Sequence, residues 1–469
     1  MNTNKNMKNN NEKNDKVDLI RGDPKIAIKA IAWPMIITLV LNMVYNMVDR
    51  VWVAGLGSDP LAAIGFVTPL FIIIGGIANG FGAGANSLIS RYIGANKKDS
   101  ADNSALHGVI IGLILSILIP LILLPCLENL LIVMGASSVI TYAKPYAAII
   151  ILGSFTLIFN GILSSELRAE GDVKRATIAL IFTGVLNMII DPIFIYTLNL
   201  GVEGAALATI LSATVATYLM LYWMFIKKDT YLSFKIKEFH YNAKITKELI
   251  AVALPASVEQ LIISVLTIIG NLILSIVATT TIIAGYTAAW SVIQVGMMTS
   301  VGIGTAAITV GGVAYGARDY EKLKTTCYYS IKLSMIIAIA IVILIEIFAP
   351  QIALLFSYST SSAHLGVIIT ETLRILALFL LGIPLGLCSA CVFQGMGKGT
   401  ISLILTVIRE LILVLLLTLI FTFVFGLAQY GLYYGLVLGV AIGSIIGFIV
   451  FKYYLKRLIK LYLYNKNIY

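Results

Sequence analysis

Long apolar runs, separated by short polar connections, fill almost the whole chain. Each run is continuous, without the period of two that a membrane strand shows, and most reach the ~20 residues that a helix needs to cross a bilayer. The pattern therefore predicts transmembrane helices. Twelve runs are predicted, at about residues 31–54, 61–84, 103–125, 139–163, 176–198, 203–226, 249–272, 280–303, 326–349, 367–392, 400–424 and 431–453.

Basic residues gather in every second connection between these runs. The stretch between the second and third runs carries Arg91, Lys97 and Lys98, and residues 227–248 carry six lysines. The intervening connections carry almost none, with Lys144 as the nearest exception. Because cytoplasmic loops are enriched in Lys and Arg, we expect both termini and residues 227–248 to lie in the cytoplasm. The chain is thus predicted to be a multi-pass protein of the plasma membrane.

The two halves of the chain repeat each other. Pro34 opens the first run and Pro255 opens the seventh, 221 residues later, and the pairs Gly94-Ala95 and Gly316-Ala317 are 222 residues apart. Parallel repeats of six helices are a transporter architecture. The predicted fold is an all-α polytopic membrane protein with twelve transmembrane helices in two six-helix repeats. Its predicted parts are a cytoplasmic polar tail (1–30), an N-terminal half (31–226), a cytoplasmic linker (227–248), a C-terminal half (249–455) and a cytoplasmic tail (456–469).

Composition and charge agree with a membrane protein. The chain is 59% hydrophobic and only 12% charged, whereas a soluble domain averages about 25% charged. Its net charge of +10 does not indicate nucleic-acid binding, because the basic residues lie in short loops beside the apolar runs. Cys388 and Cys391 lie inside an apolar run and are interpreted as packing residues rather than a metal or redox site. No ATPase motif is present, and no cofactor is expected.

A few polar residues interrupt the apolar runs. Asn187 and Asp191 are spaced i and i+4, so both side chains lie on one face of a helix. Pro192 follows and has no N–H, which leaves the carbonyl of Met188 without its helical partner. A carboxylate at membrane depth costs about 2.5–3.5 kcal/mol on insertion scales, and such residues are functional by default. Thr209 adds a hydroxyl on the next run.

The first run carries a polar stripe and a second intramembrane acid. Asn42, Tyr45, Asn46 and Asp49 are spaced 3, 1 and 3, which is one face of a helix. Together, Asp49, Asn187, Asp191 and Thr209 would supply hard oxygen ligands for a small cation, or a carboxylate pair that holds a proton. The alternative is that these residues only make separate polar contacts between helices.

Four segments resemble the multidrug and toxic compound extrusion (MATE) family, and its DinF-like and archaeal members most closely. The segments are VYNMVDRVWVAGLGSDPLAAIGFVTP, SRYIGAN, LRAEGD and NMIIDPIFIY, within about residues 25–455. The resemblance implies two V-shaped halves and an ion site made from Asp49, Asn187, Asp191 and Thr209. It further implies substrate contacts at Asn42, Tyr45 and Asn160, and at Ser164, where the family has Asn. Pro34 matches a proline that could bend the first helix, and Pro34 and Pro192 are candidate hinges.

The C-terminal half has no such acids at the matching positions. Val414 stands near the place of Asp191, and Gly270 or Asn271 near that of Asp49. Glu259, four residues after Pro255, could face the cavity, as an acid does in NorM-like relatives. Glu371 and Arg374, at i and i+3, could neutralise each other, and Arg409 and Glu410 form a further polar cluster. Structural and functional roles stay open for this second set.

The expected function is a cation-coupled (Na⁺ or H⁺) antiporter that exports amphipathic, cationic organic compounds by alternating access. Its expected partners are small-molecule substrates and the lipid bilayer, with no nucleic acid, and the chain is expected to act as a monomer. One alternative is a lipid-linked oligosaccharide flippase of the same superfamily, which would need a wide cationic groove. Another is a lipid-modifying membrane enzyme, although no Ser/His/Asp or His-rich set lies at membrane depth.

Overall fold

A computed structural model describes residues 15–357 and 365–466, and within these ranges the chain forms helices joined by turns. Its first half contains α2 to α8. Their bounds are α2 Pro24–Ala54, α3 Ser58–Gly94, α4 Lys98–Val133, α5 Ile140–Leu152, α6 Ser154–Ala169, α7 Val173–Pro192 with the π-helical turn η2 Ile193–Thr197, and α8 Gly201–Leu221.

The second half contains α9 to α16. Their bounds are α9 Ala243–Val277, α10 Thr280–Gly316, α11 Tyr320–Leu354, α12 Leu365–Ala377, α13 Phe379–Gly395, α14 Gly399–Thr406, α15 Leu415–Leu419 and α16 Gln429–Lys466. A π-helical segment, η5 Val407–Val414, joins α14 to α15.

Eleven helices in the described ranges are long and apolar enough to cross a membrane. A twelfth span is the pair Ala136–Leu152 and Ser154–Ala169, which bends by 44° at Gly153. The predicted all-α fold with twelve spans is therefore confirmed. Several helices are longer than the predicted runs, because they continue past the apolar stretch into the polar region. The connection between α3 and α4 shrinks to residues 95–97, so that Arg91 and Lys98 lie in helices.

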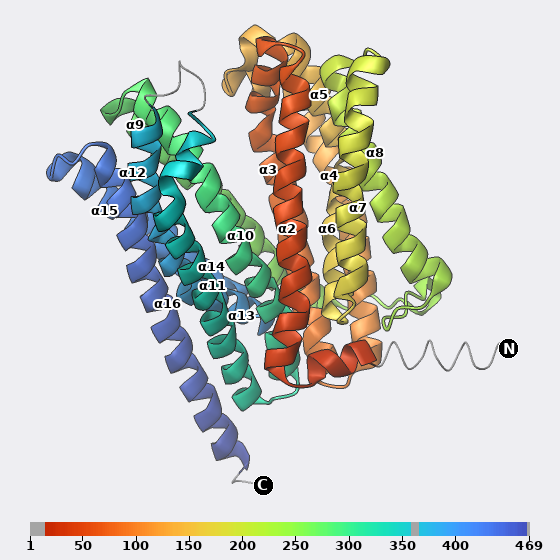
Figure 1. The fold of residues 1–469 in the computed structure, drawn as a ribbon. Coiled ribbons are helices and arrows are strands. Elements are labelled where there is room, and N and C mark those ends of the chain that lie inside the picture. The colour runs from red at the N-terminus through yellow and green to blue at the C-terminus, as the bar shows by residue number, and fades with distance from the viewer. Residues whose placement is uncertain (1–14, 358–364, 467–469) are drawn as a thin grey trace.

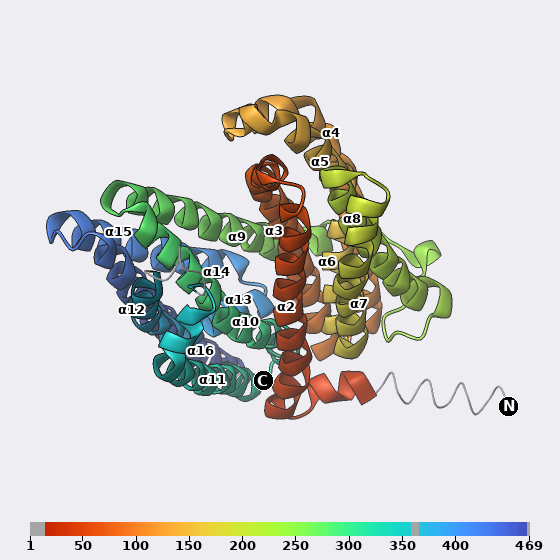
Figure 2. The same cartoon turned by 45° about the horizontal axis from the view of Figure 1, so that its top comes forward.

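The two halves form a V (Figure 1). They pack together at the end where both termini lie and splay apart toward the other end. Figure 2 shows α2 lying next to α10 where the halves meet. At this meeting point α3 packs on α9, and α10 packs on α2 and α3.

Two glycines allow helices of the two halves to approach closely at the closed end of the V. A Cβ at Gly94 would clash with the carbonyl of Val313, and a Cβ at Gly316 would clash with the carbonyl of Arg91. Gly94 and Gly316 are equivalent in the repeat, and so are Arg91 and Val313. The ends of α3 and α10 therefore cross with reciprocal contacts, and glycine lets the two backbones approach closely.

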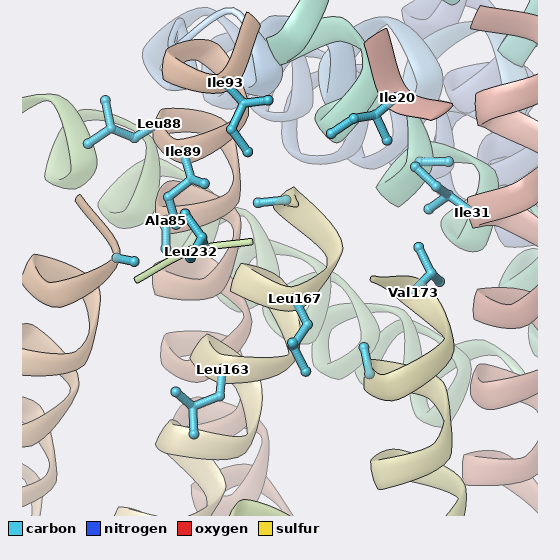
Figure 3. Packing of buried hydrophobic residues seen from close by; sticks show 14 of the residues in the cluster. Ile20, Ile31, Ala85, Leu88, Ile89, Ile93, Leu163, Leu167, Val173 and Leu232 are labelled. Atoms are coloured by element: carbon cyan, nitrogen blue, oxygen red, sulfur yellow. The ribbon is translucent and has the colours of Figure 1, made fainter. Parts of the chain in front are cut away.

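The largest described core cluster lies at this end and includes residues of both halves. Figure 3 shows Leu88, Ile89 and Ile93 of α3 near Leu163 and Leu167 of α6. The same cluster includes Ile303, Ala306 and Val310 of α10, so apolar packing at the closed end joins the two halves.

The terminal tails are shorter than predicted. Residues 15–21 are helical, and Ile20 is fully buried in the core beside Ile31 (Figure 3). Most of residues 15–30 of the expected polar tail are therefore helical, and residues 1–14 lie outside the described residues. Their cytoplasmic location stays a prediction. At the other terminus, α16 continues to Lys466, so most of the expected tail 456–469 is helical. The apolar stretches of these segments are too brief to predict a membrane span, so hydropathy alone gives no sign of their helices.

Candidate functional site

A cavity of about 860 Å³ lies between the two halves. Both halves contribute to its wall, which combines aromatic, aliphatic and methionine side chains with a few amides and charged groups. Such a mixture is typical of a site for drug-sized organic molecules. The aromatic and sulfur-containing members include Tyr45, Phe71, Tyr286, Trp290, Met297 and Met298.

The polar stripe of α2 only partly faces this cavity. Asn42 and Tyr45 line it, as the sequence predicted. Asn46 does not: its side chain is exposed and its Nδ2 donates to the carbonyl of Asn42 at 2.6 Å. The prediction for Asn46 as a cavity residue is therefore wrong, because its side chain satisfies the helix backbone instead.

Asn187 and Asp191 share one face of α7, and both are buried. Asn187 Nδ2 donates to Asp191 Oδ1 at 2.9 Å. The helix ends at Pro192 and continues as the π-helical turn η2. The Tyr196 hydroxyl in this turn donates to the carbonyl of Trp52 at the end of α2. That contact ties α2 to η2 and thereby fixes Asp49 relative to Asp191.

Three acceptor oxygens at this place have no hydrogen-bond partner among the described residues. They are Asp49 Oδ1, Asn187 Oδ1 and Asp191 Oδ2, and all three are buried. The carboxyls of Asp49 and Asp191 lie close enough to interact directly. Buried acceptors without donors are costly, and a cation or a proton would satisfy them. This donor chemistry fits a small hard cation.

Thr209 and Tyr146 complete the surroundings of this acid pair. Thr209 lines the cavity, as Asn187 does, and its hydroxyl donates to the carbonyl of Ala205 at 3.0 Å. Its oxygen can still act as an acceptor or ligand. Tyr146 of α5 is buried and interacts electrostatically with Asp49 and Asp191. Sequence reasoning missed Tyr146, because a tyrosine near the start of an apolar run gives no distinctive signal.

Asn160 and Ser164 of α6 line the cavity, as expected. Asn160 is buried and its Oδ1 has no partner in the described part of the chain. The Ser164 hydroxyl donates to the carbonyl of Gly161 at 3.1 Å, so its proton is engaged by the helix. The same wall includes Arg168, which sequence analysis noted only within the LRAEGD segment. Its Nη2 donates to Ser165 Oγ at 2.5 Å.

The second half contributes charges that partner one another. Gln394 Nε2 donates to Glu259 Oε2 at 3.0 Å and to Ser402 Oγ at 3.3 Å. Arg409 Nε pairs with Glu410 Oε1 at 2.8 Å. All five residues except Ser402 line the cavity. Glu259 therefore lies at the cavity wall, and Arg409 with Glu410 lies there too.

Glu371 and Arg374 do not form the predicted pair. Arg374 Nε lies 3.7 Å from Glu346 Oε2, and Glu371 accepts a hydrogen bond from the Tyr430 hydroxyl at 3.2 Å. Both residues are exposed and neither lines the cavity. The pairing was wrong because α11 brings an acid closer to Arg374 than its own helix does.

Pro34 does not interrupt α2 in this conformation. The helix runs unbroken from Pro24 to Ala54. The Thr38 hydroxyl donates to the carbonyl of Pro34 at 2.9 Å, a contact that favours a slight bend. The roles of Pro34 and Pro192 as hinges stay predictions.

Outside the spans, an ionic cluster joins the linker to the base of the first half. Lys16 Nζ lies 2.7 Å from Asp172, and Arg175 lies 2.7 Å from Asp229 of the linker. Burial raises the pKa of Glu170, next to this cluster, to about 8, although the backbone N–H of Leu232 donates to its carboxyl at 2.8 Å and lowers it in part. These contacts bind the linker to the first half.

Comparison with known proteins gives matches over most of the chain. The family profile described as MatE matches residues 34–193 and 255–420, one segment in each half. The multidrug export protein MepA of Staphylococcus saprophyticus is 24% identical over 381 residues, which cover 80% of this chain and 82% of that protein.

Two solved structures superpose on nearly the whole chain. One is described as the outward-facing conformation of a multidrug resistance MATE family transporter of the MOP superfamily. It has a TM-score of 0.92 and 39% identity, and the match covers 95% of this chain and 98% of that one. The other is a MOP superfamily transporter from Pyrococcus furiosus, whose binding pocket of reverse polarity was taken to suggest a different function. It has a TM-score of 0.91 and 39% identity, with 94% and 98% covered.

Proposed function

The chain belongs to the MatE family of membrane transporters, and we propose that it is a cation-coupled antiporter that exports amphipathic, cationic organic compounds by alternating access. It is a multi-pass membrane transporter and not an enzyme. Relatives described as multidrug export proteins and multidrug resistance transporters support the choice of substrate class. The apolar, aromatic cavity between the halves supports it as well.

The observation that carries the coupling is the set of buried acceptors on Asp49, Asn187 and Asp191. In this proposal, a cation or a proton enters from the open side of the V and binds these oxygens. Because Tyr45 lines the cavity only four residues before Asp49 on α2, ion binding changes the surface that the substrate contacts. Ion and substrate then compete through a shared conformational equilibrium.

The halves would rock about their closed end. In the described conformation, packing of α3 on α9 and of α10 on α2 closes one end. We place that end in the cytoplasm because its connections are basic. In this proposal the cavity therefore faces outward and is ready to take up the coupling ion. The opposite state requires the reciprocal contacts at Gly94 and Gly316 to open.

The coupling ion is proposed to be Na⁺, with H⁺ competing for the same carboxylates. A proton would need only the carboxyls of Asp49 and Asp191. The amide oxygen of Asn187 and the hydroxyl of Thr209 add neutral oxygens, which a dehydrated Na⁺ requires. Such neutral oxygens would replace water ligands of the ion at a depth where water is scarce, while the carboxylates compensate its charge.

The test is transport by the full chain in liposomes that contain ethidium as a fluorescent cation. An inward-directed Na⁺ gradient at constant pH, a pH gradient without Na⁺, and no gradient are compared. Export that follows the Na⁺ gradient supports the proposal as stated. Export driven only by the pH gradient assigns the site to H⁺. Ethidium movement that is indifferent to both gradients contradicts coupled antiport.

A second candidate is movement of a phosphate-bearing lipid, as in a flippase. It is favoured by Arg168, which lines the cavity and whose Nε is buried with no partner among the described residues. The acids Glu259 and Glu410 in the same cavity oppose it. Liposomes with a fluorescent anionic lipid distinguish the two candidates, because a flippase moves that lipid between leaflets while a drug antiporter does not.

A further inference from the structure

A second, open cavity lies at the closed end of the V, outside the drug-sized cavity. Its lining includes Arg91 of α3, Lys97 in the next turn, Lys244 and Glu248 of α9, and Arg318 after α10. We propose that this cavity, called here the basic pocket, binds the phosphate group of an anionic ligand, with a lipid headgroup as its source. The proposal is independent of the coupling mechanism.

Charge is the first argument for the ligand class. Four basic residues and one acid line the basic pocket. Lys97, Lys244 and Arg318 are exposed, so their ammonium and guanidinium groups can reach a headgroup. Basic pockets between helices on the cytoplasmic side of a membrane are suited to anionic headgroups.

Hydrogen bonds hold the Arg91 side chain in place and leave one of its donors unsatisfied. Its Nε donates to the carbonyl of Ser87 at 3.2 Å and its Nη1 to Glu248 at 3.2 Å. The guanidinium lies against Gly397, where a Cβ would be 2.7 Å from Cζ, so only glycine permits this approach. Arg91 Nη2 is buried and has no hydrogen-bond partner among the described residues. The Arg91 side chain lines the pocket with one guanidinium donor unsatisfied, and a planar guanidinium is well suited to phosphate.

Arg318 adds a conformational argument. It has a φ of 55°, in the left-handed region. The equivalent residue of the first half, 222 positions earlier, is Asn96, with a φ of 57°. Asparagine tolerates this conformation better than a long basic residue does. Arginine at this turn therefore brings a positive charge to the basic pocket at some conformational cost.

Aromatic rings form one wall of the basic pocket. The ring centroids of Tyr315 and Tyr320 are 6.4 Å apart, and those of Tyr320 and Tyr462 are 5.3 Å apart. Tyrosine is enriched at the level of lipid headgroups, where its ring is apolar and its hydroxyl is hydrated. This wall favours a lipid, with a glycerol backbone or acyl chain next to the phosphate, over a free phosphate ion.

Both halves of the chain contribute to the basic pocket. Arg91 and Lys97 belong to the first half, whereas Lys244, Glu248 and Arg318 belong to the second. The pair Arg91–Glu248 already joins the halves here. A ligand that contacts both halves binds better when the closed end is closed, so its binding shifts the equilibrium toward the conformation described here.

The experiment uses the purified full chain in a neutral detergent and follows its thermal midpoint and its native mass spectrum. Dihexanoyl phosphatidylglycerol, dihexanoyl phosphatidylcholine and inorganic phosphate are titrated separately. The key variant is Arg318→Asn, because asparagine is the residue of the equivalent turn and relieves the strain while removing the charge. The matched control is Lys237→Asn, an exposed basic residue of the linker outside the pocket.

We expect saturable stabilisation by phosphatidylglycerol and little by phosphatidylcholine. Arg318→Asn should bind phosphatidylglycerol about fivefold more weakly, the effect of one basic residue near a membrane surface, and Lys237→Asn should bind as the original chain does. If inorganic phosphate stabilises the protein equally, and Arg318→Asn weakens that effect too, the pocket is a phosphate site for a soluble compound instead of a lipid. Equal response to both lipids, or unchanged affinity in Arg318→Asn, overturns the proposal. No readout depends on transport, so failure here leaves the proposed antiport untouched.

Discussion

The two halves share one fold but differ in how far their buried charges are paired. In the first half, Asp49, Asn187 and Asp191 keep buried acceptor oxygens without donors among the described residues. In the second half, Arg409 compensates Glu410, and Gln394 donates to Glu259. Val414, near the place of Asp191, is a buried aliphatic residue. In the second half, Glu259 Oε1 also lacks a partner among the described residues. The repeat therefore preserves the helix scaffold, but only the first half gathers unpartnered acceptors from several residues, including two acids, at one place.

That difference indicates which buried polar groups serve packing and which serve ion binding. Paired charges within one half can stay satisfied in every conformation, and so they respond little to an ion. Unpaired acceptors need an outside partner, and the availability of that partner depends on which side of the membrane the cavity faces. A transporter with one such half needs only one ion site, whereas closure of the V requires both halves equally.

The largest expected effect comes from removing the unpaired acids. Asp49→Asn and Asp191→Asn should each reduce ion-coupled export in liposomes by about 100-fold, because the amide keeps the size but loses a charge whose burial costs about 2.5–3.5 kcal/mol. Expression and thermal midpoint should stay close to those of the original chain. Val414→Ala is the matched control in the other half and should retain coupled export. Near-normal coupling in both Asp variants would move the site elsewhere, with Glu259 next in line.

Substitution of the paired charges of the second half should change the stability of the protein more than its coupling. Glu410→Gln leaves Arg409 buried without its partner and should cost about 3–5 kcal/mol. The double variant Arg409→Met/Glu410→Gln should recover much of that loss, since no buried charge stays unpaired. Thermal and SDS-induced unfolding measure the difference. A double variant that is less stable than Glu410→Gln would contradict this account of the pair.

The closed end should respond to substitutions in both halves alike. Gly94→Ala and Gly316→Ala should each destabilise the closed end by about 1–3 kcal/mol, the usual effect of overpacking, and favour opening toward the termini. Electron–electron distances between spin labels at Asp99 and Glu321 would lengthen, in a Cys126→Ser background because the other cysteines are buried. Gly65→Ala is the control, since a Cβ at Gly65 meets nothing within 4 Å. A response to only one of the two glycines would show that their crossing is not reciprocal.

The smallest expected effect sharpens the identity of the ion. Apparent Na⁺ affinity, read by calorimetry or intrinsic fluorescence, should weaken as pH falls, because protons compete for Asp49 and Asp191. Thr209→Ala should lower the apparent Na⁺ affinity about two- to tenfold, the range of one neutral polar contact. It should affect H⁺ coupling less. Thr209→Ser keeps the hydroxyl and should restore the affinity. If Na⁺ has no effect at any pH, the acids form a proton site.

Much of the site was predictable from the chain because its residues are rare in their surroundings. A carboxylate in an apolar run has few structural explanations, so Asp49 and Asp191 stand out without a structure. The i and i+4 spacing put Asn187 and Asp191 on one face of a helix, and in the structure Asn187 donates a hydrogen bond to Asp191 there. Asn46 fits the same helical spacing and still lies outside the cavity. The polar stripe of the helix is wider than the part of it that lines the cavity.

The sequence by itself determined the twelve spans, their repeat and the acids at membrane depth, since hydropathy and helical periodicity are local properties of a chain. Tertiary structure alone decided which charges are paired. Arg374 found Glu346 of a neighbouring helix instead of Glu371 of its own. Tyr146 reached the acid pair, and Arg91 came to lie between the halves with Glu248. These contacts depend on how separate helices pack, and residues far apart in the chain give no local sign of the partner that packing will bring to them.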